Sequence, residues 1–281
     1  MSGFAPDWLK LREGTDHRAR DKGLLQKLSA HFADRAEVRV MDLGAGLGSN
    51  LRGTFAALPA RQHWILVDHD PVLLAAACEA IADWADSARP TASGVEAIKD
   101  GRSLHVALKR HDLAADPAPW AGEKPDLVTA AALFDLVSEP WIERFVAALA
   151  QAKLAFYTVL THDNTTAWLP AHPSDTEMHA AFESHFERDK GFGPSAGGRA
   201  SSLIANALEK SGYIVECASS PWQLGHEDKA LIAALAQGWA DAVRETGKVP
   251  EAAIKAWLEA RTADGVTCTV GHEDLLALPT R

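Results

Sequence analysis

The chain has 281 residues, 47% of them hydrophobic, and its 28 basic and 38 acidic side chains give a formal net charge of −10. This balance disfavours nucleic acid as a partner, because proteins that bind nucleic acid gather Lys and Arg into a phosphate-binding face. No run approaches the ~18 apolar residues of a membrane span, no secretory signal is visible, and the three cysteines form no C-x-x-C pair. We therefore expect a cytoplasmic protein with an ordinary apolar core and no membrane partner.

The N-terminal part of the chain is predicted to be helical. Residues 1–35 are expected to form a helical cap, and residues 16–33 an amphipathic helix within it. The apolar side chains of this helix recur at helical spacing: Leu24, Leu25, Leu28 and Phe32.

A glycine-rich turn follows the first predicted strand. Residues 38–43 read as a buried strand, and Gly44, Gly46 and Gly48 then lead into a helix over 50–57. Glycine accepts positive φ and lets a ligand approach the backbone, while the first N–H groups of the helix point at the same ligand. The carboxylate of Asp42 before the turn would repel a dinucleotide pyrophosphate but hold an ammonium group. The pattern therefore favours an amino-acid-bearing nucleotide such as S-adenosylmethionine over NAD.

Strands and helices continue to alternate through the first half of the chain. Asp70 directly precedes Pro71 and is interpreted as a helix N-cap. Residues 89–101 are expected to be a polar loop with room for a short helix. Further strands are predicted over 64–68, 104–110, 125–133 and 154–160, and helices over 71–86 and 140–150. This alternation predicts an α/β fold with a doubly wound sheet.

The strand ends resemble, in their order, those of the class I (Rossmann-like) S-adenosylmethionine-dependent methyltransferases. Residues 38–50 resemble motif I of that family, a hydrophobic strand followed by (D/E)-x-G-x-G-x-G, and residues 125–133 look like its motif IV. The resemblance is good over residues 36–160 and looser beyond. It implies a mostly parallel seven-stranded sheet with an antiparallel last strand, flanked by helices and carrying a helical lid or insertion.

The resemblance also implies which residues bind the cofactor. Asp68, the acid that ends the second strand, suits the ribose hydroxyls. Asp112, the acid after the third strand, corresponds to an acid that faces the adenine amino group in the family. Arg18, on the leading helix, is the expected partner of the methionine carboxylate. Besides Arg18, the residues expected to bind S-adenosylmethionine and its product S-adenosylhomocysteine are Asp42, Gly44, Ala45, Gly46, Gly48, Asp68, His69, Asp112, Leu113 and Ala131. Structural alternatives stay open, since Asp112 can be a helix N-cap and Arg18 part of a solvated helix face.

The second half departs from the simplest form of the family. Residues 161–199 are too long for a plain loop and are interpreted as a lid or substrate-binding insertion. A helical insertion over 226–263 separates the last two predicted strands, 213–218 and 266–278, which leaves their order in the sheet open. The methyltransferase-like domain is expected to span residues 36–281.

These features predict an enzyme that transfers a methyl group from S-adenosylmethionine to a small molecule by SN2 displacement. Such a step mainly needs alignment and exclusion of water, with a general base where the nucleophile must lose a proton. Asp135 after the fourth strand and His162 after the fifth are the candidate catalytic residues. No metal is expected, because neither a full oxygen ligand set nor zinc-type histidine spacing is present. A non-catalytic S-adenosylmethionine-binding protein and an NAD(P)-dependent oxidoreductase remain alternatives.

Overall fold

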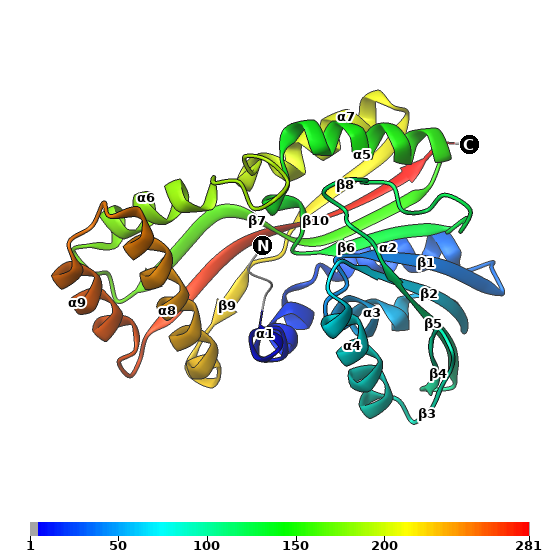
Figure 1. Cartoon of the computed structure of the whole chain (residues 1–281), viewed down its shortest axis with the longest axis horizontal. Helices are drawn as coiled ribbons and strands as arrows, with labels where there is room; N and C mark the ends of the chain where they lie inside the picture. The colour runs from blue at the N-terminus through cyan, green and yellow to red at the C-terminus, as the bar shows by residue number, and fades with distance from the viewer. Residues whose placement is uncertain (1–4, 281) are drawn as a thin grey trace.

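The computed structural model describes residues 5–280, which build one ten-stranded sheet with helices on both faces (Figure 1). The strands run in the order β3-β4-β5-β2-β1-β6-β7-β10-β8, with the short β9 paired to β10. Their bounds are β1 Glu37–Leu43, β2 Arg61–Asp68, β3 Ser87–Pro90, β4 Gly94–Lys99, β5 Arg102–Arg110, β6 Leu127–Ala131, β7 Ala155–Leu169, β8 Tyr213–Ser219, β9 Trp222–Leu224 and β10 Thr267–Pro279.

The helices alternate with these strands. The α-helices are α1 Pro6–Ala19, α2 Lys22–Phe32, α3 Ser49–Thr54, α4 Pro71–Trp84, α5 Glu139–Ala152, α6 Asp175–Phe186, α7 Ala200–Lys210, α8 Lys229–Thr246 and α9 Glu251–Arg261. Short 3₁₀ turns are η1 Phe55–Ala57, η2 Phe134–Leu136, η3 Gly197–Arg199 and η4 His226–Asp228. Within residues 5–280, no helix combines the length and apolar character needed to cross a membrane.

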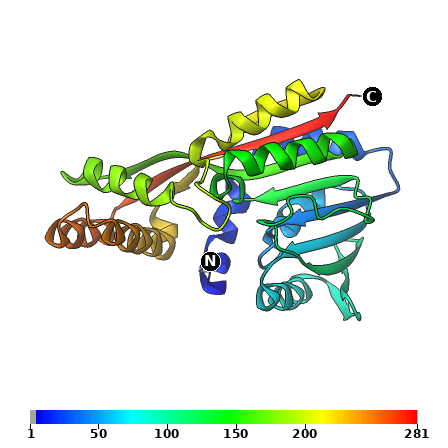
Figure 2. The same cartoon turned by 45° about the horizontal axis from the view of Figure 1, so that its top comes forward.

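The sheet confirms the predicted fold class. β5, β2, β1, β6 and β7 are parallel neighbours, and β10 lies antiparallel between β7 and β8. The last two long strands, β8 and β10, thus pair with each other despite the helical insertion between them, which settles the order that the sequence left open. The reason is that the insertion extends from one end of the sheet, together with α6, and leaves the edge of β7 free to pair with β10 (Figures 1 and 2).

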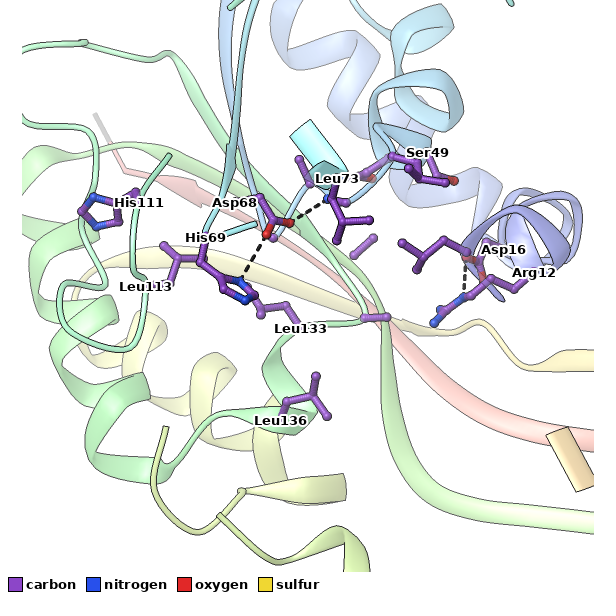
Figure 3. Close-up of a pocket in the computed structure, with 18 of the residues that line it drawn as sticks. Arg12, Asp16, Ser49, Asp68, His69, Leu73, His111, Leu113, Leu133 and Leu136 are labelled. Carbon is purple, nitrogen blue, oxygen red and sulfur yellow. Dashed lines mark hydrogen bonds and ion pairs between the residues drawn. The ribbon is translucent and has the colours of Figure 1, made fainter. Parts of the chain in front are cut away.

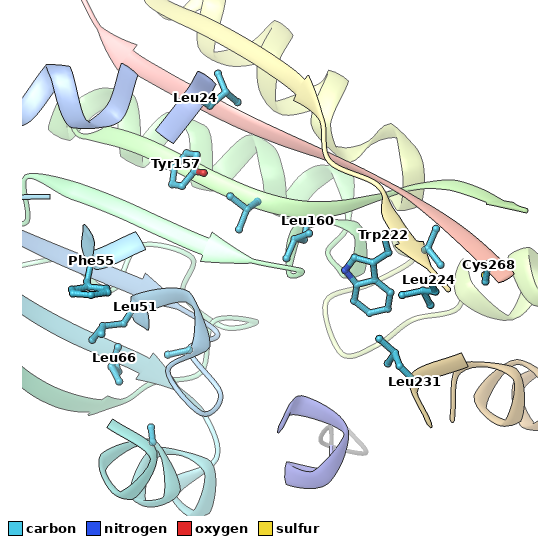
Figure 4. Close-up of a cluster of buried hydrophobic side chains, with 14 of the residues drawn as sticks. Leu24, Leu51, Phe55, Leu66, Tyr157, Leu160, Trp222, Leu224, Leu231 and Cys268 are labelled. Atoms are coloured by element: carbon cyan, nitrogen blue, oxygen red, sulfur yellow. The ribbon is translucent and has the colours of Figure 1, made fainter. Parts of the chain in front are cut away.

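Alternation along the strands creates two apolar layers, one on each face of the sheet. In β1, Val38 and Val40 point to one layer and Met41 and Leu43 to the other. The first layer is covered by α2, α3 and α4. Figure 4 shows part of this layer, with Leu24 and Cys268 among the labelled side chains. The second layer is covered by α5 and α7, whose buried side chains are Trp141, Ile142, Phe145, Val146, Leu149, Ile204 and Leu208.

The single helix predicted over residues 16–33 is wrong, because the chain forms two helices that meet at Arg20 and Asp21. The Asp21 carboxylate accepts a hydrogen bond from the Leu24 N–H at 2.7 Å and so caps α2. Arg20 is buried, and its Nη1 donates to Thr54 Oγ1 at 2.8 Å. The cap and this tertiary contact stop α1 and redirect the chain.

The polar loop predicted over residues 89–101 is also wrong, because most of it belongs to a β-hairpin. β4 pairs antiparallel with β5 and β3 with β4, which adds two strands to the edge of the sheet. Val95 and Ala97 turn inward and are buried, while the alternate residues face outward. An added Cβ at Gly94 would lie 2.1 Å from the carbonyl oxygen of Val106, so only glycine allows this close pairing.

The fifth strand is longer than predicted. β7 runs on to Leu169, so the first part of the expected lid over 161–199 is strand, paired with β10 as far as Thr267. Register shifts in β10 around His272 and Glu273 bend the pair away from the parallel sheet. α6, α8 and α9 pack around the end of this long pair, where the rings of Trp168, Trp239 and Trp257 are in contact.

Candidate cofactor and acceptor site

The glycine-rich turn between β1 and α3 has the backbone conformation that its sequence predicts. Gly44, Gly46 and Gly48 have φ values of 64°, 51° and 74°, in the left-handed region that favours glycine. The N–H of Ala45 donates to the carbonyl oxygen of Val67 at 3.0 Å, which ties the turn to β2. The turn is therefore a rigid edge of the site.

A pocket opens over this turn at the carboxyl ends of β1, β2, β5 and β6 (Figure 3). In doubly wound sheets this edge is where ligands bind. The pocket is lined by Leu9, Arg12, Asp16, Gly44, Ala45, Gly46, Leu47, Ser49, Asn50, Asp68, His69, Leu73, His111, Asp112, Leu113, Ala131, Ala132, Leu133, Leu136 and Phe192. Most of the residues expected to bind the cofactor are thus brought together, whereas Arg18, Asp42 and Gly48 do not line the pocket.

Asp68 is fixed at the end of β2 by backbone donors. Its Oδ2 accepts from the Gly46 N–H at 3.0 Å and its Oδ1 from the Asp70 N–H at 3.0 Å. The Nδ1 atom of His69 lies 3.2 Å from Oδ1 (Figure 3). Asp70 itself caps α4, as predicted, by accepting from the Val72 N–H at 2.8 Å. The Asp68 carboxylate is therefore held in one orientation and retains lone pairs toward the pocket.

Asp42 lies behind the pocket wall and not at its surface. Its side chain is fully buried, and Oδ1 accepts from Asn50 Nδ2 at 2.6 Å. Burial raises the pKa of Asp42 to about 7, against the lowering effect of the Asn50 hydrogen bond. Asn50 also donates to Thr129 Oγ1 at 3.1 Å and itself lines the pocket. Asp42 therefore does not line the pocket itself, whereas Asn50, its hydrogen-bond partner, does.

Asp112 and Leu113 follow β5 and line the end of the pocket beside His69. Oδ1 of Asp112 accepts from the Ala114 N–H at 3.0 Å, which forms a local turn and not the helix N-cap of the structural alternative, because no helix follows Asp112 before β6. The side chain of Asp112 is nevertheless exposed to the pocket. Leu113 is buried, and its carbonyl oxygen accepts from Trp141 Nε1 at 2.6 Å.

The arginine at the pocket is Arg12 and not Arg18. Arg18 Nη2 donates to Asp228 Oδ1 at 2.6 Å, and its side chain is 60% exposed. Arg12 Nε donates to Asp16 Oδ2 at 2.8 Å, and its guanidinium lies 5.0 Å from the centre of the Trp222 ring. Six residues of α-helix turn the chain by about 600°, so the two arginines face directions roughly 120° apart. The i,i+4 spacing of Arg12 and Asp16 was the signal available in the sequence.

Asp135 and His162 lie next to the pocket but do not line it. Asp135 sits in η2, directly after β6, and burial raises its pKa to about 6. His162 Nδ1 accepts a hydrogen bond from the Asn164 N–H at 3.2 Å, and burial lowers the pKa of the ring. Asp135 thus directly follows β6, as expected, whereas His162 lies within the longer β7.

The segment interpreted as a lid or substrate-binding insertion, residues 161–199, contributes one residue to the lining of the pocket. Phe192 reaches it from the segment between α6 and η3, and its ring packs edge-on against Trp141 with centroids 5.7 Å apart. Gly191 and Gly193 on either side have φ values of 102° and 87°, and both donate their N–H to Asp189 Oδ1. The Gly-Phe-Gly pattern was visible, but only the fold places it over the site.

Across residues 5–280, no group of three or more His, Cys, Asp or Glu side chains lies close enough together to hold a metal ion. The acidic and histidine side chains around the pocket instead pair with backbone donors or with one another.

No protein-family model and no curated protein matches the chain. Among solved structures it is similar to the YcgJ protein of Bacillus subtilis, with 13% identity, a TM-score of 0.49, and coverage of 93% of this chain and 100% of that one. It is also similar to a cyclopropane synthase of Mycobacterium tuberculosis, with 12% identity, a TM-score of 0.49, and coverage of 98% and 94%. For YjhP of E. coli the identity is 15%, the TM-score 0.45, and the coverage 99% and 100%. At these identities the likeness concerns the fold alone.

Proposed function

We propose that the protein binds S-adenosylmethionine in this pocket and transfers its methyl group to a small-molecule acceptor. The observation that supports this most directly is the position of Asp68. Its carboxylate lines the pocket one hydrogen bond away from the glycine-rich turn, at the end of the strand next to β1. A carboxylate held in this way can accept both hydroxyls of a ribose while the turn admits the rest of the nucleoside.

The other lining residues fit the remaining parts of the same cofactor. Asp112 and Leu113 offer an acceptor and an apolar contact for a base, as the resemblance to the methyltransferases implies. Asn50 and Asp16 offer oxygens to an ammonium group, and the Nη atoms of Arg12 offer donors to a carboxylate. Gly44 and Gly46 keep the space over the turn free of Cβ atoms.

The bound cofactor would supply a methyl group on a sulfonium, which is electrophilic without further activation. The protein's part is then to align the acceptor and to exclude water. Leu133 and Leu136 after β6 give the pocket an apolar wall, and Phe192, which packs against the same core cluster as Leu133, adds to it. This enclosure, together with the net charge of −10, supports a small molecule in preference to a nucleic acid as acceptor.

Isothermal titration with S-adenosylmethionine, S-adenosylhomocysteine and NAD tests the proposal. We expect micromolar binding of both sulfur nucleotides and a loss of tenfold or more in Asp68→Ala, about 1.4 kcal/mol. Asp83→Ala, on the exposed side of α4, is the matched control and should bind as the wild type does. If neither sulfur nucleotide binds, the proposal is refuted. Tight binding of NAD in their place would indicate an oxidoreductase.

A further inference from the structure

A buried polar cluster lies beside the pocket, where β7 and β10 pass η2. It consists of Asp135 from η2, His162 from β7 and His272 from β10. Asp135 and His272 are only 6% and 5% exposed, and His162 is half-buried. His272 is the member that the sequence did not indicate, because it lies on the last strand and far from any motif.

The three side chains form one connected group. His162 and His272 are register partners on the two strands, with ring centroids 5.7 Å apart. Asp135 lies against the same strand, because η2 packs against β7, and the backbone of His162 lowers the pKa of the Asp135 carboxyl. Trp222 packs on His272 with centroids 5.2 Å apart and carries the guanidinium of Arg12 on its ring. Arg12 lines the pocket and its charge lowers the pKa of both Asp135 and His272, so the cluster lies near the Arg12 side of the pocket although none of its three members lines it.

Two polar atoms of this cluster have no hydrogen-bond partner among the described residues: Oδ1 of Asp135 and Nδ1 of His272. A buried polar atom without a partner is unfavourable by about 1–3 kcal/mol, and a ligand that supplied the missing partners would remove this cost. His162 differs, because its Nδ1 already accepts from Asn164. In the neutral ring the proton is then on Nε2, which makes His162 a donor and leaves Asp135 as the free acceptor.

We propose that Asp135 and His272 form the polar end of the acceptor site and bind a neutral O–H or N–H group carried on an apolar body. This inference rests on the proposed methyl transfer. Asp135 Oδ1 accepts the O–H or N–H, while His272 Nδ1 donates to a hydroxyl oxygen or accepts a second N–H, according to its tautomer. The apolar body lies against Leu133, Leu136 and Phe192. An anionic acceptor is disfavoured, because the carboxylates of Asp135 and Asp16 both lie near Arg12 and outnumber its single charge.

The transfer step balances with these groups alone. A lone pair on the acceptor oxygen or nitrogen forms the bond to the methyl carbon, and the pair of the broken S–CH3 bond stays on sulfur. The proton that leaves the acceptor moves to Asp135 Oδ1. Burial raises the pKa of Asp135 to about 6, which makes its carboxylate a stronger base than an exposed one. His272 positions the acceptor through Nδ1.

Four single-ring probes test this assignment by titration of the protein with and without S-adenosylhomocysteine. Phenol and aniline carry a neutral O–H or N–H, anisole lacks a donor, and benzoate is an anion. We expect phenol or aniline to bind at least about tenfold more tightly than anisole and benzoate, and the better of the two identifies the acceptor as O–H or N–H. Asp135→Leu, which removes the acceptor oxygen, and His272→Phe should each remove that preference.

The variants should leave the affinity for S-adenosylhomocysteine unchanged, and His63→Phe, on the outer face of β2, should behave as the wild type does. Anisole binding as tightly as phenol, benzoate binding most tightly, no binding of phenol or aniline at millimolar concentration, or unchanged preference in Asp135→Leu would each overturn the assignment. If S-adenosylhomocysteine does not bind, the proposed function is refuted instead. The titrations without S-adenosylhomocysteine then still measure which probe the protein prefers.

Discussion

The buried carboxyl of Asp42 makes stability depend on pH in a direction opposite to that of most surface carboxylates. In the folded protein burial raises the pKa of Asp42 from 3.8 to about 7. Between these two values the folded state keeps a proton that the unfolded state has lost. Unfolding therefore releases a proton, and the free energy of unfolding falls as pH rises by about 1.4 kcal/mol per unit until the folded pKa is passed.

The structure sets the size of this effect. Between about pH 5.5 and 7.5, a folded pKa near 7 predicts a loss of about 2 kcal/mol of unfolding free energy from Asp42 alone. Asp42→Asn cannot ionise, and its carbonyl oxygen still accepts from Asn50, so this variant should lack that part of the pH slope. Asp135, with a pKa of about 6, contributes in the same direction at the lower end of the range in both proteins.

Urea unfolding of the cofactor-free protein at several pH values measures the difference. Between about pH 5.5 and 7.5, the free energy of unfolding of Asp42→Asn should rise by about 2 kcal/mol relative to that of the wild type. Asp83→Asn, exposed on α4, should keep the slope of the wild type. Parallel pH curves for Asp42→Asn and the wild type would refute the reasoning, because they would mean that the Asp42 carboxyl ionises equally in both states.

Three backbone positions give further predictions that urea unfolding can check. Gly94→Ala places a Cβ 2.1 Å from the Val106 carbonyl oxygen and should lower the unfolding free energy by about 1–3 kcal/mol, so an unchanged midpoint would contradict the tight β4–β5 pairing. A Cβ added at Gly238, inside α8, has no neighbouring atom within 4 Å, so Gly238→Ala should raise the unfolding free energy by about 1 kcal/mol. A lower unfolding free energy would mean that α8 packs differently there. Lys153 ends α5 at φ 52°, so Lys153→Gly should gain about 0.5 kcal/mol, whereas Lys153→Ala should gain nothing.

Features that depend on neighbouring residues were predictable from the sequence. Asp70 before Pro71 gave the N-cap of α4, and the three alternating glycines gave a turn with positive φ. Both depend on the local backbone, which a few adjacent residues determine. The one local error of this kind, the helix over 16–33, arose because the cap at Asp21 lies inside an otherwise continuous helical pattern.

Partners from distant parts of the chain were not predictable. Asp274 on β10 is an example: its carboxylate accepts from the N–H groups of Leu160 and Asp21 and from Ser220 Oγ. It holds Leu160 at a φ of 58° and so bends β7 just before His162. No spacing in the sequence links these residues, because β7, β8 and β10 meet only when the sheet is complete.

The sequence by itself determined the alternation of strands and helices through the parallel core, the glycine-rich turn after β1 and the acid at the end of β2, since each follows from hydrophobic period and backbone preference within a short segment. Only the tertiary structure decided that Arg12 and not Arg18 faces the pocket, that Asn50 stands in front of Asp42, and that His272 lies beside His162. Orientation, burial and the pKa values that burial changes depend on which elements pack together. Those contacts are made between segments far apart in the chain.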